Sequence, residues 1–189
     1  PLFGEAGSGM HFHIRVHKGG ANLFYDPAGY GTVGEAGRRF IAGLLHHGGG
    51  VMALTNPSTN SYRRLIPGFE APISAIYSLG NRSAAIRIPK YANDPDSARF
   101  EFRPPDAMCN PYLAIAAQLM AGIDGIQRQL DPTALGFGPV DEDIFSWSTE
   151  KRAQIKALPT SMEEAMTALE GDQGFLLAGD VLNKDLIDR

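Results

Sequence analysis

The sequence predicts an α+β fold in which a sheet of antiparallel strands is backed by helices. Strand-like stretches separated by turn residues occur at residues 11–16, 73–79, 83–89 and 99–103. A long, largely apolar segment begins at Asn110 and Pro111, which suit the N-cap and the first position of a helix. With 189 residues the chain can bury a core, and we expect one domain or a large part of one.

The first third of the chain predicts a hairpin and a helix. The first strand covers residues 11–16, a turn follows at Lys18, Gly19 and Gly20, and residues 22–25 form the return strand. Apolar residues recur at near-helical spacing within residues 34–47, which predicts a helix. The glycines at positions 48–50 are expected to end it.

The middle and end of the chain predict a functional loop, further strands and a helical tail. Residues 55–72 are rich in Asn, Pro, Ser and Gly, so regular structure is not expected there, and their aromatic and arginine residues favour function over disorder. The long helix should run from Asn110 to about Leu130 and be mostly buried. Shorter helices are expected near residues 161–169, 173–178 and 183–188.

Composition narrows the classes of protein that the chain can belong to. A formal charge of −4 gives no general basic field, so no nucleic-acid partner is expected. A single cysteine, Cys109, cannot form a disulfide within the chain, which fits a reducing cytoplasm. No apolar run has the length of a membrane span, and no signal peptide is present, so no membrane partner is expected. Because the chain begins at Pro1 without a methionine, we expect a piece whose N-terminal portion is missing.

Two strand-like segments carry residues suited to metal and phosphate chemistry. A glycine-rich turn leads into His11 and His13, whose i, i+2 spacing places both imidazoles on one face of a strand. By spacing alone the two histidines could equally be structural or surface residues. In the second segment Arg99, Glu101 and Arg103 share one face, opposite a pair of phenylalanines. These strands are predicted to line a site for a divalent metal and phosphate groups.

Arginines are concentrated in the middle of the chain. Six of them, against one lysine, lie between positions 63 and 103: Arg63, Arg64, Arg82, Arg87, Arg99 and Arg103. Arginine offers a planar fork to carboxylate and phosphate, so this bias favours anion recognition over ordinary surface pairing. Glu70 lies in a Pro-Gly-rich loop and is either a solvated carboxylate or a lid carboxylate over a site. Cys109 is expected to be a small buried residue.

Together these motifs resemble glutamine synthetase, in the C-terminal region of its catalytic domain. The resemblance covers essentially the whole chain, residues 1–189, and many ordered blocks make it specific. The blocks that carry it are GSGMHFH (7–13), TNP (55–57), NSY (60–62), RLIPGFEAP (64–72), NRSA (81–84), RIP (87–89), EFR (101–103), NPYLA (110–114) and LMAG (119–122).

The resemblance implies ATP-dependent joining of ammonia to the γ-carboxylate of glutamate through γ-glutamyl phosphate. It implies roles as follows: His11 and Glu101 for Mg²⁺ or Mn²⁺; His13, Arg87 and Arg99 for the nucleotide phosphates; Gly7, Arg64 and Arg103 for glutamate; Arg82 at the transferred phosphoryl group; and Glu70 as the flap carboxylate. It also implies homo-oligomers of stacked rings. The N-terminal domain and the upstream catalytic segment, with further metal-binding glutamates, are expected outside this chain, which alone should be inactive.

Four positions depart from the pattern of the family. Ala6 replaces a glutamate-contacting asparagine, Arg15 a serine and Asp96 a lysine near the nucleotide, and Phe145 an adenylylated tyrosine. The first two leave open a γ-glutamyl–amine or polyamine ligase of the same superfamily. A non-catalytic scaffold of the same fold is a further alternative, against which Glu70, Arg82 and Glu101 argue.

Overall fold

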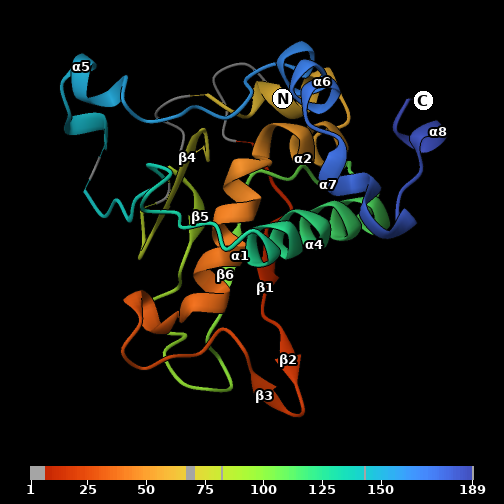
Figure 1. Ribbon diagram of the computed structural model, residues 1–189. Coiled ribbons are helices and arrows are strands. Elements are labelled where there is room, and N and C mark those ends of the chain that lie inside the picture. Colours follow the sequence, from red (N-terminus) through yellow and green to blue (C-terminus); the bar gives the residue numbers. More distant parts are fainter. Residues whose placement is uncertain (1–6, 67–70, 82, 143, 189) are drawn as a thin grey trace.

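The chain folds as a mixed sheet covered by helices (Figure 1). The computed structural model describes residues 7–66, 71–81, 83–142 and 144–188. Its main sheet has four strands in the order β1 (Phe12–Ile14), β6 (Phe100–Phe102), β5 (Ala84–Arg87) and β4 (Ser74–Ser78). The β1–β6 and β6–β5 pairs are antiparallel, whereas β5 and β4 are parallel. The predicted α+β class is confirmed, and the parallel pair is the exception to the expected antiparallel arrangement.

The predicted N-terminal hairpin is smaller than expected. It consists of β2 (His17–Lys18) and β3 (Ala21–Asn22), which form a separate two-stranded sheet. Gly19 and Gly20 make the turn with φ of 58° and 84°, a conformation that glycine adopts without strain. Residues 12–14, predicted to pair with the return strand, instead pair with β6 far along the chain. That long-range pairing places the two predicted site strands side by side.

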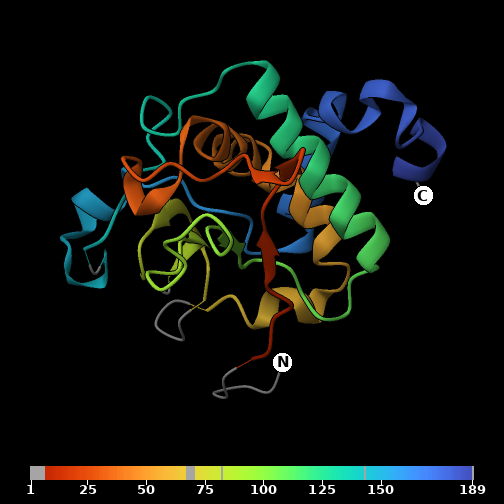
Figure 2. The ribbon, with the colours of Figure 1, turned by 90° about the horizontal axis from the view of Figure 1, so that it is seen from below.

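Helices lie over the sheet in a layer that Figures 1 and 2 show from two directions. The α-helices are α1 (Glu35–His46), α2 (Gly48–Thr55), α3 (Thr59–Arg63), α4 (Pro111–Gln127), α5 (Thr149–Arg152), α6 (Met162–Gly171), α7 (Gly174–Leu177) and α8 (Lys184–Ile187). Short 3₁₀ turns are η1 (Tyr30–Thr32), η2 (Ile144–Ser146) and η3 (Ala178–Asp180). The helices predicted near residues 34–47, 110–130 and 161–169 are confirmed.

The region after α1 is more helical than predicted. Helix α1 ends at His46, just before the glycine triplet, as predicted, but the triplet itself begins α2, and its glycines lie where a side chain would not fit. A Cβ on Gly49 would lie 2.7 Å from the Ala168 Cβ, and one on Gly48 would lie 2.8 Å from Leu158. Residues 55–72 also contain α3, since Ser58 and Ser61 form a reciprocal capping box at its start.

The long helix α4 starts as predicted but is less buried than predicted. The Asn110 side chain accepts hydrogen bonds from the backbone N–H groups of Tyr112 and Leu113, at 3.0 and 3.4 Å. Its inner face carries small buried residues. Its outer face exposes the apolar side chains of Tyr112, Ile115, Leu119 and Ile123.

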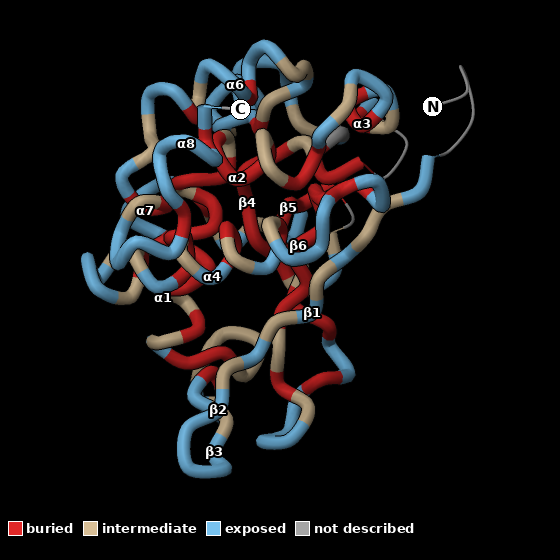
Figure 3. Tube along the Cα trace, turned by 90° about the vertical axis from the view of Figure 1, so that its right-hand side faces the viewer, coloured by how far each residue is buried: buried red, intermediate tan, exposed pale blue. Residues whose placement is uncertain are grey.

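An aromatic cluster joins the sheet to the helical layer. The ring of Phe24 stacks on Phe100 of β6 at 5.4 Å and meets the edge of Phe40 of α1 at 5.4 Å. All three are at most 1% exposed. Buried residues follow β4, β5 and β6 through the centre of the molecule (Figure 3). Because Phe100 and Phe102 face this core, Glu101 between them must face the opposite side of the strand.

Helices α1 and α4 approach each other through glycines. A Cβ on Gly43 would lie 2.1 Å from the carbonyl oxygen of Ala121, and one on Gly125 would lie 2.3 Å from the carbonyl oxygen of Arg39. A Cβ on Gly122 would overlap the Phe40 ring at 2.2 Å. The absence of side chains at these positions sets the separation of the two helices.

We expect Gly43→Ala to destabilise the chain by about 2 kcal/mol, because the new methyl group meets backbone that cannot rotate away. Urea unfolding followed by circular dichroism measures the change. Gly171→Ala is the matched control: its Cβ would meet nothing within 4 Å, so its stability should equal or exceed wild type. Equal stabilities for the two variants would contradict this account of the helix contact.

A buried histidine ties the helices together away from the sheet. His47, 2% exposed, lies between α1 and α2. Its Nδ1 is 2.6 Å from Asp172 Oδ2, and its Nε2 is 2.7 Å from Asp124 Oδ2. Its ring also stacks on Phe175 with centroids 4.1 Å apart. His47 therefore links α4, through Asp124, to the end of α6, through Asp172.

Candidate functional site

Strand register brings the predicted site residues to one face of the sheet. His13 lies directly opposite Glu101 in the β1–β6 pair, and Arg87 lies directly opposite Glu101 in the β5–β6 pair. Opposite residues on neighbouring strands project from the same face, so an imidazole, a carboxylate and a guanidinium lie in one row. Two residues along, His11 and Arg103 extend this row at the same end of the strands.

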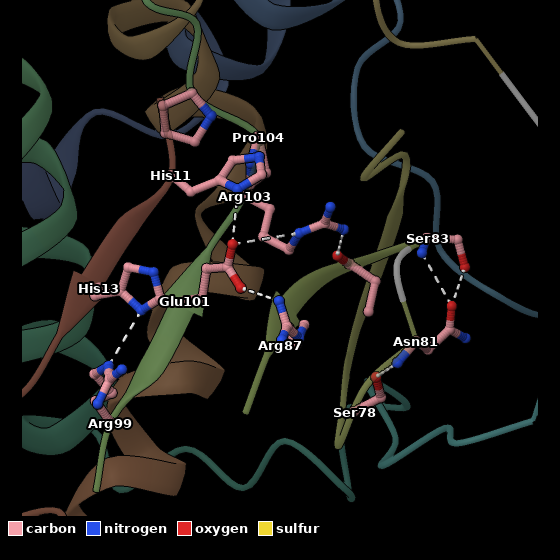
Figure 4. Close-up of polar contacts among 12 residues, drawn as sticks. His11, His13, Ser78, Asn81, Ser83, Arg87, Arg99, Glu101, Arg103 and Pro104 are labelled. Carbon is pink, nitrogen blue, oxygen red and sulfur yellow. Dashed lines mark hydrogen bonds and ion pairs between the residues drawn. The ribbon is translucent and has the colours of Figure 1, made fainter. Parts of the chain in front are cut away.

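Glu101 is the centre of the site (Figure 4). Its Oε1 is 2.7 Å from His11 Nδ1 and 3.7 Å from Arg103 Nε, while its Oε2 accepts a 3.0 Å hydrogen bond from Arg87. The residue is 4% exposed. Burial alone would raise the pKa of Glu101, but the His11 contact and the charges of Arg103 and Arg87 outweigh it and hold this pKa below its usual value. Glu101 is therefore an ionised carboxylate at neutral pH.

His13 forms a second pair with Arg99. Arg99 Nε donates to His13 Nδ1 at 3.3 Å, and the Arg99 guanidinium lies 5.4 Å from the centre of the Tyr91 ring. Burial, joined by the charges of Arg99 and Arg87, lowers the pKa of His13 despite the opposing charge of Glu101. A neutral ring that accepts at Nδ1 carries its proton on Nε2, where it can donate to a phosphate oxygen.

Arg64 lies in a cradle of backbone groups. Its Nη2 donates to the carbonyl oxygens of Arg103, Pro104 and Pro105 at 3.1, 2.5 and 3.0 Å. Gly7 and Gly9 also pack closely against Arg64: a Cβ on Gly7 would lie 2.4 Å from the Arg64 Cβ, and one on Gly9 would lie 2.8 Å from its Nη1. Arg64 Nε is buried and has no hydrogen-bond partner among the described residues. An unsatisfied buried donor is costly, which fits a guanidinium that binds an anionic ligand.

The metal-binding set that these residues can offer is partial. His11 and Glu101 supply one imidazole and one carboxylate close together, donors that suit Mn²⁺ and, through the carboxylate, Mg²⁺. No cluster of three or more His, Cys, Asp or Glu residues with metal-binding geometry occurs in the described ranges. The residues present fit part of a divalent-metal site, and complete coordination needs oxygen ligands beyond them.

Eight of the ten predicted residues lie in the described ranges, and all eight belong to the row of side chains around Glu101 (the Glu101 row) or to the adjoining Arg64 cradle. Gly7 meets Arg64; His11, Arg87 and Arg103 meet Glu101; and His13 meets Arg99. Glu70, Arg82 and Ala6 lie outside the described residues, as does the side chain of Phe145. The departures Arg15 and Asp96 are in contact, since Arg15 Nη1 donates to the Asp96 carbonyl oxygen. Cys109 is buried, as predicted.

Three residues of the site were not predicted from the sequence. Tyr91 contacts Arg99 through its ring and, at 3.4 Å, through its hydroxyl. Asn56 donates to the Pro104 carbonyl oxygen, and Asp106 follows the same segment. The available signal was the pair of consecutive prolines at positions 104 and 105: they lack N–H donors, so other groups must hold that segment.

A sheet that presents an imidazole–carboxylate pair among arginines defines an anion-binding site with part of a divalent-metal site. Comparison with known proteins specifies the class. A family profile described as "Glutamine synthetase, catalytic domain" matches residues 1–189. The chain is 50% identical over 188 residues to a glutamine synthetase of Frankia alni, and 48% identical over 187 residues to one of Nostoc sp.. These matches include 100% and 99% of this chain, but 39% and 38% of the lengths of the two relatives.

A solved structure agrees with the sequence matches. The cryo-EM structure of Plasmodium falciparum glutamine synthetase superposes with a TM-score of 0.83 at 28% identity, covering 100% of this chain and 43% of that one. The chain belongs to the glutamine synthetase family, as its motifs predicted. It spans about two fifths of the length of the relatives that it matches.

Proposed function

We propose that this chain forms the C-terminal part of a glutamine synthetase catalytic domain. In the intact protein it would help join ammonia to the γ-carboxylate of glutamate with ATP, through γ-glutamyl phosphate. The observation that carries the proposal is the Glu101 row, in which an ionised carboxylate touches His11 on one side and Arg87 on the other. Phosphoryl transfer to a carboxylate brings together several anionic groups, and fixed cations around them are the main source of catalysis.

The chain's own residues divide this work by position. Arg64 and Arg103, with Gly7 beside Arg64, would hold glutamate. His13, Arg87 and Arg99 would bind the nucleotide phosphates, with Tyr91 packed against Arg99. Arg82 would face the transferred phosphoryl group and Glu70 would close over the intermediate, as the resemblance implies. His11 and Glu101 would hold one Mg²⁺ or Mn²⁺, which when bound neutralises phosphate charge.

The partial ligand set supports a further part of the proposal. The remaining metal ligands would come from polypeptide beyond these 189 residues, and the intact protein would assemble as a homo-oligomer. No helix in the described ranges is long and apolar enough to cross a membrane. The cytoplasmic location expected from the single cysteine stays a prediction.

A coupled assay on the intact gene product tests the function. We expect ADP and phosphate release that requires glutamate, ATP, a divalent metal and ammonia, with glutamine as the product. Methylamine and putrescine should replace ammonia poorly, and a strong preference for putrescine would instead identify a polyamine ligase. The isolated 189-residue chain should form no glutamine. Failure of the intact protein to bind ATP or Mn²⁺ would favour the non-catalytic scaffold.

A further inference from the structure

The position of Arg64 is set by a backbone segment that lacks hydrogen-bond donors of its own. Its Nη2 donates to three successive carbonyl groups, those of residues 103–105. Pro104 and Pro105 lack N–H groups, so this segment can only accept hydrogen bonds from its neighbours, as the Pro105 carbonyl oxygen does from the Met10 N–H at 2.9 Å. Its geometry must therefore come from groups on other parts of the chain.

Two buried polar side chains supply much of that support. Asn56, 1% exposed at the end of α2, donates from Nδ2 to the Pro104 carbonyl oxygen at 3.0 Å. Its Oδ1 accepts a 2.8 Å hydrogen bond from the Thr55 hydroxyl, which fixes the orientation of the amide. The Pro104 oxygen thus accepts from both Asn56 and Arg64, so the two donors share one acceptor.

Asp106 holds the other end of the same segment. Its backbone N–H donates to the Thr55 carbonyl oxygen at 3.0 Å. Its carboxylate accepts a 2.5 Å hydrogen bond from Ser61, a 1%-exposed residue of α3. Arg64 follows α3 directly. Asp106 consequently connects the carbonyl cradle to the helix from which Arg64 extends.

We infer that Asn56 and Asp106 are positioning residues for Arg64: they fix the prolyl segment whose carbonyl groups hold one edge of its guanidinium, so that the other edge is aimed at an anionic ligand. The identity of that ligand as glutamate rests on the proposed function. The Asn56 side chain bonds Thr55 and Pro104, and the Asp106 carboxylate bonds Ser61, so both act on Arg64 through the segment that holds it.

Steady-state kinetics of the intact gene product provide the first test. Loss of one buried hydrogen bond corresponds to about a tenfold effect on binding. We expect Asn56→Ala to raise the KM for glutamate about tenfold, with the KM for ATP unchanged and kcat less affected than KM. Asn56→Asp keeps the shape of the side chain but removes its N–H donor, so it should raise the KM for glutamate to a similar extent. Asp106→Ala should raise the KM for glutamate. Asp106→Asn can still accept the hydrogen bond from Ser61, so its KM for glutamate should stay near the wild-type value.

Asn22→Ala is the matched control, because Asn22 also donates from its amide to backbone carbonyl oxygens, those of Pro95 and Ala98. It should leave the KM for glutamate at the wild-type value. An equal rise in the KM for glutamate and ATP in Asn56→Ala, or an unchanged KM for glutamate in both Asn56 variants, would overturn the inference.

Chemical modification gives a readout that does not depend on the reaction. Phenylglyoxal modifies free guanidinium groups, and tandem mass spectrometry separates Arg64 from the adjacent, exposed Arg63. We expect the modification rate of Arg64 relative to Arg63 to rise at least about threefold in Asn56→Ala, since the cradle opens locally. If the ratio of Arg64 to Arg63 modification rises in Asn56→Ala but the wild-type protein forms no glutamine, the proposed function is refuted and the positioning role of Asn56 is retained. An unchanged ratio would refute the positioning role.

Discussion

Replacing Glu101 with glutamine should lower kcat for glutamine synthesis by the intact gene product by about a thousandfold or more. The amide has the shape of the carboxylate but no charge. Three groups that face the carboxylate, His11, Arg87 and Arg103, then lose their shared anion. Weaker Mn²⁺ binding should accompany the loss of activity, and electron paramagnetic resonance of free Mn²⁺ measures it.

Stability must be separated from catalysis in this experiment. Arg103 is 7% exposed, so removing the Glu101 charge leaves it beside a neutral group in a buried site. His11→Asn avoids that difficulty, because the His11 side chain is 32% exposed. It should reduce Mn²⁺ affinity while the urea midpoint stays near that of wild type. Glu164→Gln is the control, since this exposed glutamate lies at the start of α6 and bonds Thr160.

Two outcomes would contradict the role assigned to Glu101. One is a Glu101→Gln enzyme that keeps more than about a tenth of the wild-type kcat, which is less than the loss of a single preorganised electrostatic group usually causes. The other is unchanged Mn²⁺ affinity in both Glu101→Gln and His11→Asn. Either result would make the Glu101 row a structural salt-bridge network.

Elements that depend on interactions between residues close in the sequence were predicted from the sequence. The caps at Asn110 and Ser161 fixed the starts of α4 and α6, because each side chain bonds backbone N–H groups two or three residues away. The alternation in residues 99–103 predicted β6 and assigned Glu101 to the face opposite the phenylalanines. Such signals need no knowledge of the rest of the chain.

Elements that depend on distant partners were predicted poorly. Residues 12–14 pair with β6 rather than within a local hairpin, and β4 and β5 run parallel although few residues connect them. The glycine triplet was expected only to end the preceding helix. That it also begins α2 was not predicted, because it fits against Leu158 and Ala168, more than a hundred positions away. Propensity is a weak guide where tertiary packing decides.

For the site, too, local patterns were predicted and contacts between distant residues were not. Spacing placed His11 and His13 together as possible metal ligands, and only the family resemblance separated their roles. The structure brings His11 to Glu101 and His13 to Arg99, a division consistent with those roles, which stay predictions. The carbonyl cradle of Arg64 was missed because backbone acceptors have no sequence signature of their own.

The helical layer depends on His47 in a way that predicts a large loss of stability. Replacing His47 with alanine should cost about 4 kcal/mol, because the chain loses a buried ring that forms hydrogen bonds with two carboxylates. Asp124 would keep Arg128, whereas Asp172 would have no cation partner among the described residues. The stacking on Phe175 would also be lost. Urea unfolding of the chain at neutral pH measures the difference.

Lowering the pH should weaken the same contact. Burial would raise the pKa of Asp124, but hydrogen bonds from His47 and Arg128 outweigh burial and lower it. A carboxylate with a lowered pKa in the folded state contributes fully above its unfolded value, about 3.9. That contribution is lost as the pH falls through the lower folded value. Wild type should therefore lose more stability than Asp124→Asn between about pH 4 and pH 2.

His46→Ala is the matched control for His47→Ala, since it removes the adjacent histidine. The His46 side chain is half-buried and forms no hydrogen bond with the described residues, so we expect a change of less than about 1 kcal/mol. The double variant His47→Ala/Asp172→Asn should recover part of the loss, because it removes the unpaired carboxylate as well. Equal effects of His46→Ala and His47→Ala, with no recovery in the double variant, would show that the contacts of His47 with Asp124 and Asp172 do not hold the helices together.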